Sequence, residues 1–287
     1  MKKIMASLLV VISCTLSPVF AAPQESMEEK TLETHIAETI SDVIEVAYNE
    51  VGYLEKSSNS NLYDKTANAG SNNYTKYAND LSSWGFYSGG MNSLAWCDMF
   101  VDWCLTATFG AESAKNISYQ TPYGSAACET SMSYYKSVGQ FYETPQPGDQ
   151  IFFTNGYQSN HTGLVYKVDN NTVYTIEGNT SSSPGVVPNG GAVSAKSYKL
   201  TSSRIAGYGR PNYIAIANQK KIEYDILLEQ KRQEEIKAQQ EALRLQKEQE
   251  KQKLREQLSS SPKLMFDNSQ MNLNNINKDS SFNTILG

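Results

Sequence analysis

A cysteine and a histidine are the residues of this sequence best suited to carry out chemistry. Cys97 stands where a polar loop meets a stretch with helical spacing, and backbone amides at a helix start stabilise a thiolate. His161 is its expected partner, because an imidazole takes the thiol proton and later returns it to a leaving amine. We interpret the other histidine, His35, as a solvated helix residue beside an apolar stripe. The sequence therefore predicts a cysteine–histidine pair for nucleophilic catalysis.

A third polar group has to hold the imidazole in the useful tautomer. Strands expected over residues 161–168 and 172–177 bring two such groups near the histidine. If residues 169–171 form a three-residue turn, His161 lies opposite Asn179, and Glu177 shares its face. A two-residue turn would shift the pairing by one residue and place both groups on the other face. The catalytic interpretation therefore predicts the three-residue turn.

The elements that position these residues are expected to follow the order of an α+β domain, with helices first and strands later. Apolar residues recur at steps of three and four over residues 25–52 and 97–109, which predicts two helices. Residues 55–90 are expected to form an ordered loop region. Clusters of Asn, Gly, Ser and Pro separate the expected strands, which are residues 150–154, 161–168, 172–177, 192–200 and 205–211.

Four segments, in this order, resemble the CHAP domain, the cysteine, histidine-dependent amidohydrolase/peptidase family. They are residues 96–103 (WCDMFVDW), 147–149 (PGD), 161–165 (HTGLV) and 175–180 (TIEGNT), and the resemblance covers about residues 42–213. It implies a papain-like α+β fold, with N-terminal helices packed on an antiparallel sheet. It also implies hydrolysis of an amide bond in bacterial peptidoglycan, by an N-acetylmuramoyl-L-alanine amidase or by a stem-peptide or cross-bridge endopeptidase.

By matching position, the resemblance makes Cys97 the nucleophile and His161 the general base and acid. It makes Glu177 the residue that orients the histidine and Asn179 a further polar partner. One departure lies near the nucleophile, since this chain has Leu94 where many members carry Gln. The oxyanion donors are therefore left open, with the Cys97 backbone N–H expected and Asn92 as a side-chain candidate.

The remaining cysteines leave one question open. Cys104 and Cys128 are compatible with a disulfide in an oxidising compartment, and Cys104 is equally compatible with a buried free thiol. The cysteines and His161 lack the close paired spacing typical of zinc ligands. We therefore expect no metal site and no cofactor.

The N-terminal end predicts export. Residues 1–21 combine two lysines, an apolar run and small residues, which indicates a secretory signal peptide cleaved after Ala21. A lipoprotein signal, with Cys14 as the lipid-carrying residue, is the alternative. Residues 22–41 then form a helical lead-in to the domain at residues 42–213. A secreted, periplasmic or cell-wall-associated protein is expected.

The C-terminal end changes composition beyond Asn218. Residues 219–258 are helix formers with both charge signs mixed. They favour a solvated single helix stabilised by charge pairs four residues apart. A coiled coil that recruits a protein partner or a second copy is the alternative. Residues 259–287 are rich in Asn and Ser and are expected to be disordered.

Net charge and hydropathy exclude some classes of protein. The chain has 287 residues, with 25 Lys and Arg against 30 Asp and Glu, and a net charge of -5 argues against a nucleic-acid partner. No run after the signal is long enough to cross a bilayer. Two functions remain: a peptidoglycan hydrolase, and a non-catalytic wall-binding or scaffolding protein whose helical arm recruits a partner. The four site residues favour the enzyme, because a binding module has no chemical need for all of them.

Overall fold

A computed structural model describes residues 28–260 of the chain. The predicted signal segment, Cys14 and nearly all of the predicted tail lie outside these residues. Within residues 28–260, no helix combines the length and the apolar character that a membrane crossing requires.

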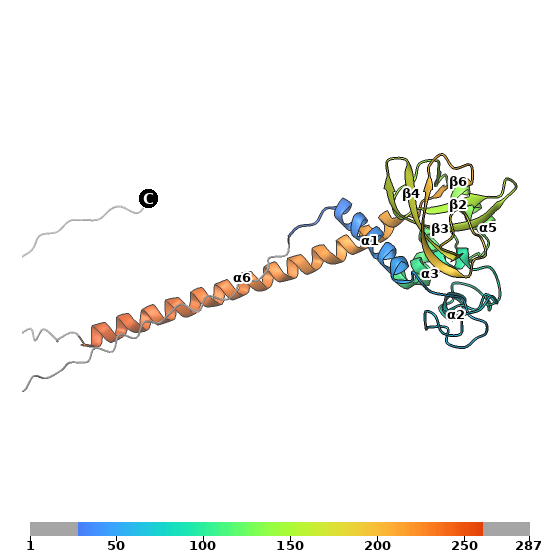
Figure 1. The fold of residues 1–287 in the computed structure, drawn as a ribbon. Coiled ribbons are helices and arrows are strands. Elements are labelled where there is room, and N and C mark those ends of the chain that lie inside the picture. The colour runs from blue at the N-terminus through green and yellow to red at the C-terminus, as the bar shows by residue number, and fades with distance from the viewer. Residues whose placement is uncertain (1–27, 261–287) are drawn as a thin grey trace, which may run out of the picture. The chain divides into compact units, whose positions relative to one another are not determined.

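The described chain is α+β, as the sequence predicts (Figure 1). Its strands form one six-stranded antiparallel sheet in the order β1-β6-β2-β3-β4-β5. The helices are α1 (Leu32–Asn49), α2 (Lys76–Ser83), α3 (Cys97–Phe109), α4 (Ala111–Ile117), α5 (Cys128–Ser137) and α6 (Tyr213–Ser260). The strands are β1 (Phe141–Tyr142), β2 (Gln150–Thr154), β3 (Ser159–Asp169), β4 (Thr172–Thr180), β5 (Ala192–Lys199) and β6 (Ile205–Gly209).

The bounds of α3 and β2 coincide with the predicted ranges, whereas three short helices were not predicted. The expectation of a loop throughout residues 55–90 is wrong, because α2 lies within it. α2 begins at a Thr75 N-cap, whose hydroxyl accepts a hydrogen bond from the Ala78 N–H at 3.2 Å. α4 and α5 have seven and ten residues. Elements this short depend on caps and tertiary packing more than on periodic sequence.

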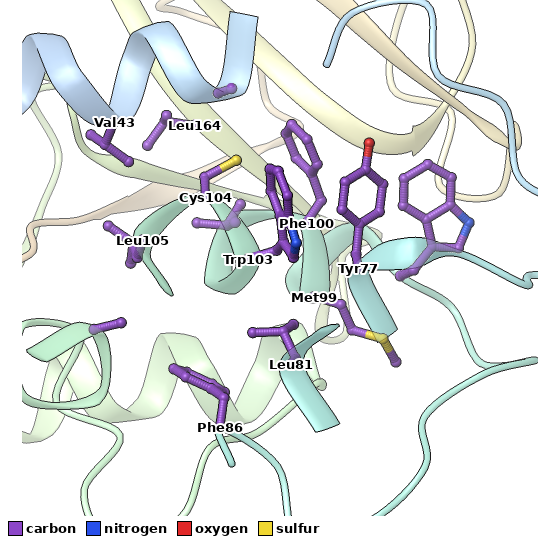
Figure 2. Close-up of a cluster of buried hydrophobic side chains, with 14 of the residues drawn as sticks. Val43, Tyr77, Leu81, Phe86, Met99, Phe100, Trp103, Cys104, Leu105 and Leu164 are labelled. Carbon is purple, nitrogen blue, oxygen red and sulfur yellow. The ribbon is translucent and has the colours of Figure 1, made fainter. Parts of the chain in front are cut away.

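Helix α3 is the centre of the main core. It is buried along most of its length and packs against α1, α2, α4 and the strands β3 and β4. Figure 2 shows its apolar side chains among those of neighbouring elements. The cluster includes Phe100, Trp103, Cys104 and Leu105 from α3, Val43 from α1, Tyr77 and Leu81 from α2, and Leu164 from β3. This packing therefore fixes the position of Cys97, the first residue of α3.

The interpretation of His35 as a solvated residue is wrong. Its side chain is buried in α1 and packs edge-on against the Tyr224 ring of α6, with 5.4 Å between ring centroids. The first turns of α6 cover this side of α1, where Lys220 also pairs with Asp42 at 2.5 Å. His35 therefore has a packing role that the α1 sequence alone does not indicate.

Helix α6 is continuous but belongs to two units, which divide between Leu228 and Glu229. In the first unit, Tyr213, Ala217 and Leu228 are buried. In the second, all described residues, 229–260, are exposed. Charged side chains pair along this part, as when Arg244 contacts Glu241 at 3.4 Å and Glu248 at 3.9 Å. These contacts lie within one helix and stabilise it locally.

Candidate active site

The Cys97 thiol lies at the first residue of α3, and its surroundings favour the thiolate. The N-cap residue, Trp96, makes no capping side-chain hydrogen bond within the described residues, so the first amides of α3 stay available. A hydrogen bond from the Cys128 thiol is the largest influence lowering the pKa of Cys97. Burial opposes it, but the contact with His161 and the Asp98 backbone N–H add to it. The pKa of Cys97 therefore lies well below that of an ordinary cysteine.

The His161 imidazole, on β3, is buried between the thiol and a carboxylate. Its Nε2 atom lies 2.9 Å from Oε2 of Glu177. Burial alone would lower the pKa of His161, but the hydrogen bonds and charges of Cys97 and Glu177 outweigh it and raise the pKa to about 9. Because Glu177 engages Nε2, Nδ1 is the nitrogen left for the thiol. The lowered pKa of Cys97 and the raised pKa of His161 therefore favour the pair as thiolate and imidazolium.

The Glu177 carboxylate, on β4, is fixed by two further donors. The Thr175 hydroxyl donates to Oε1 at 2.5 Å, and the Tyr198 hydroxyl of β5 donates to Oε2 at 3.2 Å. Neither residue was predicted from the sequence. Thr175 was detectable, because residues two apart on a strand share a face. Tyr198 was not, since its place depends on the β4–β5 pairing.

The predicted three-residue turn is wrong, but His161 and Glu177 do share a face of the sheet, as predicted. Asp169 pairs with Thr172, which leaves Asn170 and Asn171 as a two-residue turn. The register then shifts between Val165 and Lys167, so that Leu164 pairs with Ile176. This β-bulge adds one residue to β3 and reverses the effect of the shorter turn. His161 and Glu177 therefore share a face because of the bulge.

Gly163 lets the carboxylate approach the imidazole. A Cβ atom added at this position would lie 2.5 Å from Cγ of Glu177 and 2.9 Å from the Ile176 carbonyl oxygen. Gly163 and His161 are two residues apart on β3, so they lie on the same side of the strand. The absence of a side chain at Gly163 therefore makes room for the Glu177–His161 contact.

Asn179 is brought to the same end of β4 but is not joined to His161. It is fully buried in a left-handed backbone conformation, with φ of 52°. Neither its amide oxygen nor its amide nitrogen has a hydrogen-bond partner among residues 28–260. The predicted polar contact with the histidine is therefore missing from the described structure.

Cys128 is a site residue that was not predicted from the sequence. Its sulfur lies 3.5 Å from that of Cys97. Cys104 instead lies in the main core, as Figure 2 shows, and all three cysteines among the described residues are free. The Cys104–Cys128 disulfide left open by the sequence is therefore not formed. A separation of 31 residues and an unpredicted helix α5 concealed the contact between Cys97 and Cys128.

A groove of about 570 Å³ opens beside the two sulfurs. Leu94, which is about half exposed, lines it together with Ala126 and Gln158. The side-chain oxygen of Asn92 accepts a hydrogen bond from the Thr75 backbone N–H at 3.1 Å, and Asn92 does not line the groove. Residues 28–260 contain no group of three or more ligands suited to a metal ion. Cys97 and Cys128 both line the groove, so a ligand bound there would lie beside the two sulfurs.

Of three comparisons with known proteins, one matches a family. A search of curated proteins finds no match. Among solved structures, the chain is similar to "The crystal structure of Ly7917" at 12% identity and a TM-score of 0.34. The match covers 61% of this chain and 62% of that one, less than two thirds of its length, and a likeness this distant says nothing about activity. Residues 87–179, however, match the CHAP domain family. The segment that contains Cys97, His161, Glu177 and Asn179 is therefore a CHAP domain, the domain of a family of peptidoglycan hydrolases.

Proposed function

We propose that this protein hydrolyses an amide bond of bacterial peptidoglycan with Cys97 as the nucleophile. The observation that supports this proposal most strongly is the buried chain of contacts from the Cys97 thiol through His161 to Glu177. A binding module would gain nothing from a thiol held as a thiolate beside an imidazolium. The CHAP match supplies the substrate class.

Acylation begins with attack of the Cys97 thiolate on the substrate carbonyl carbon. The oxygen of the tetrahedral intermediate gains negative charge, and the Cys97 backbone N–H, unpaired within the helix, is the proposed donor to it. The His161 imidazolium then gives its proton to the leaving nitrogen, and the C–N bond breaks. A thioester on Cys97 and a free amine result.

Deacylation reverses the proton transfers. The now neutral His161 takes a proton from water, and the resulting hydroxide attacks the thioester carbon. The C–S bond breaks, and the Cys97 thiolate is restored beside the imidazolium. Throughout, Glu177 keeps the Nε2 side of the ring engaged, so that Nδ1 faces the reacting atoms. Thr175 and Tyr198 hold Glu177 in that position.

A peptidoglycan substrate would require the enzyme to act outside the cytoplasm, and we propose that the protein is exported. The signal peptide predicted over residues 1–21 supports export, and cleavage after Ala21 would release the protein. Sequencing the N-terminus of the protein collected outside the cytoplasm tests this directly. A mature N-terminus at Ala22 is expected, whereas a lipid-modified N-terminal Cys14 would favour the lipoprotein alternative.

Digestion of purified peptidoglycan tests the function and identifies the bond. Mass analysis of the products distinguishes the two activities: muramic acid freed of its peptide indicates an amidase, and new peptide termini indicate an endopeptidase. Cys97→Ser is the control, because the hydroxyl keeps the size of the side chain and lacks a readily ionised thiol. Equal product release by wild type and Cys97→Ser would overturn the proposal.

A further inference from the structure

A second thiol faces the first across the start of two helices. Cys97 opens α3 and Cys128 opens α5, and their sulfurs are 3.5 Å apart, close to van der Waals contact. Both residues line the same groove, so a small reagent in the groove reaches both. The proposed hydrolysis needs one thiol. The second one requires a separate explanation.

Cys128 is held in this position by neighbours in its own helix turn. The Ser131 hydroxyl donates to Oδ2 of Asp98 at 2.6 Å, which ties α5 to the first turn of α3. The Glu129 carboxylate accepts from the Ser159 backbone N–H at 2.6 Å, which ties α5 to β3. The contact between the sulfurs is therefore set by the packing of α5 against both elements that carry the catalytic pair.

One proton is shared unequally between the two thiols. The hydrogen bond to Cys97 is the largest influence raising the pKa of Cys128, and burial adds to it. Cys97 is thus the thiolate and Cys128 the protonated donor. Oxidation of Cys97 to an uncharged group would remove the negative charge that keeps Cys128 protonated, and a thiolate at Cys128 is the species that attacks oxidised sulfur.

We propose that Cys97 and Cys128 form a reversible disulfide when the protein meets a hydroperoxide, and that this bond switches the hydrolase off. The switching rests on the proposed function, because it requires Cys97 to be the nucleophile. Formation of the disulfide does not rest on the proposed function, because it requires the two sulfurs and a hydroperoxide but no peptidoglycan.

The reaction has two steps. The Cys97 thiolate attacks an oxygen of the hydroperoxide; an S–O bond forms, the O–O bond breaks, and the departing oxygen takes a proton to leave as an alcohol or water. Cys97 is now a sulfenic acid, and its sulfur has lost two electrons. The Cys128 sulfur then attacks it; the S–S bond forms, the S–O bond breaks, and hydroxide leaves with the Cys128 proton as water. A dithiol reverses the change by exchange, and both thiols return.

Mapping the disulfide tests the bond without any substrate. The full chain is treated with hydrogen peroxide, its free thiols are alkylated after denaturation, and a non-reducing digest is analysed by mass spectrometry. The expected product links the Cys97 peptide to the Cys128 peptide, in wild type and in the matched Cys104→Ala variant alike. Unlinked Cys97 and Cys128 peptides, or a link from Cys97 to another cysteine, would overturn the proposal.

Recovery of peptidoglycan hydrolysis tests the switch. After inactivation by peroxide, dithiothreitol is expected to restore the activity of the wild type several-fold more fully than the activity of Cys128→Ser. In that variant no second thiol traps the sulfenic acid, so Cys97 is oxidised further to sulfinic and sulfonic acids, which the dithiol does not reduce. Thermal unfolding of Cys128→Ser checks that the variant is folded. Equal recovery in both proteins would contradict the switch. If untreated wild type releases no products, the proposed function fails, while the disulfide map still decides whether the bond forms.

Discussion

Helix α3 and residues 229–260 of α6 are both helical, but different interactions stabilise them. α3 is buried on nearly every side and is held by the elements that surround it. Residues 229–260 are exposed throughout and are helical through residue propensity and pairs such as Arg244 with Glu248. Local preference is enough to make a helix, but positioning a nucleophile to within a fraction of an ångström requires packing on several sides.

The largest effect on activity is expected from a change at the nucleophile. Cys97→Ala should lower peptidoglycan hydrolysis by at least about 10⁴-fold, because loss of the nucleophile removes the covalent route. Leu254→Ala, an exposed change in α6, is the matched control and should leave the rate unaltered. Product release per unit time measures both. Comparable losses of activity in the two variants would contradict the claim that α3 carries the nucleophile and that residues 229–260 take no part in catalysis.

The next largest effect is expected on stability. Phe100→Ala in α3 should reduce the free energy of unfolding by about 3–5 kcal/mol, because Phe100 is fully buried among aromatic neighbours. Leu243→Ala in α6 truncates a half-exposed side chain and should change it by less than about 0.5 kcal/mol. Urea unfolding followed by fluorescence measures both. A small loss for Phe100→Ala would mean that α3 does not depend on its packing.

A smaller loss of activity is expected when the contact between Glu177 and His161 is disturbed. Gly163→Ala forces the Glu177 side chain to move, and should lower hydrolysis by about 10- to 100-fold through misplacement of the His161 ring. Gly89→Ala is the matched control, because no described atom lies within 4 Å of an added Cβ there. Unchanged hydrolysis in Gly163→Ala would show that the imidazole does not need the carboxylate in this position.

The smallest effect is expected in the charge pairs of α6. Arg244→Ala removes contacts with Glu241 and Glu248 in an exposed helix, and each such pair contributes only about 0.3–0.5 kcal/mol. Helix content measured by circular dichroism should fall slightly, and less so in high salt, which screens the pairs. The rate of hydrolysis should not change. A large loss of activity would mean that residues 229–260 take part in catalysis.

Which residues lie together was easier to predict from the sequence than the strand register that brings them together. Cys97 and His161 were selected because cysteine and histidine are rare in the chain, and Glu177 because strand alternation places it near His161. The contact between His161 and Glu177 agrees with this grouping. The α+β class and the bounds of α3 also followed from periodicity. The turn at Asn170 and the bulge near Tyr166 were not predictable, since two opposite shifts of register leave the same face pattern.

The second thiol was missed for a different reason. Cys128 begins α5, whose ten residues carry weak apolar periodicity, so neither the helix nor its direction could be inferred. Its contact with Cys97 depends on tertiary hydrogen bonds, such as that from Ser131 to Asp98. His35 was misjudged similarly, because α6, which covers it, lies almost 200 residues further along the chain. Long-range contacts of this kind leave no local pattern.

The pH dependence of Cys97 alkylation tests the central claim most directly, which is that the hydrogen bond from Cys128 and the contact with His161 hold the Cys97 thiol as a thiolate. The rate of iodoacetamide modification of Cys97, followed by peptide mass spectrometry, reports the thiolate fraction. Because the pKa of Cys97 is lowered, the wild-type rate should reach its plateau well below the ordinary cysteine pKa, about 8.5. His161→Ala removes one cause of that lowering, so its midpoint should move to higher pH, while Cys128 still limits the shift. A wild-type midpoint near that of an ordinary cysteine, unchanged in His161→Ala, would contradict the account.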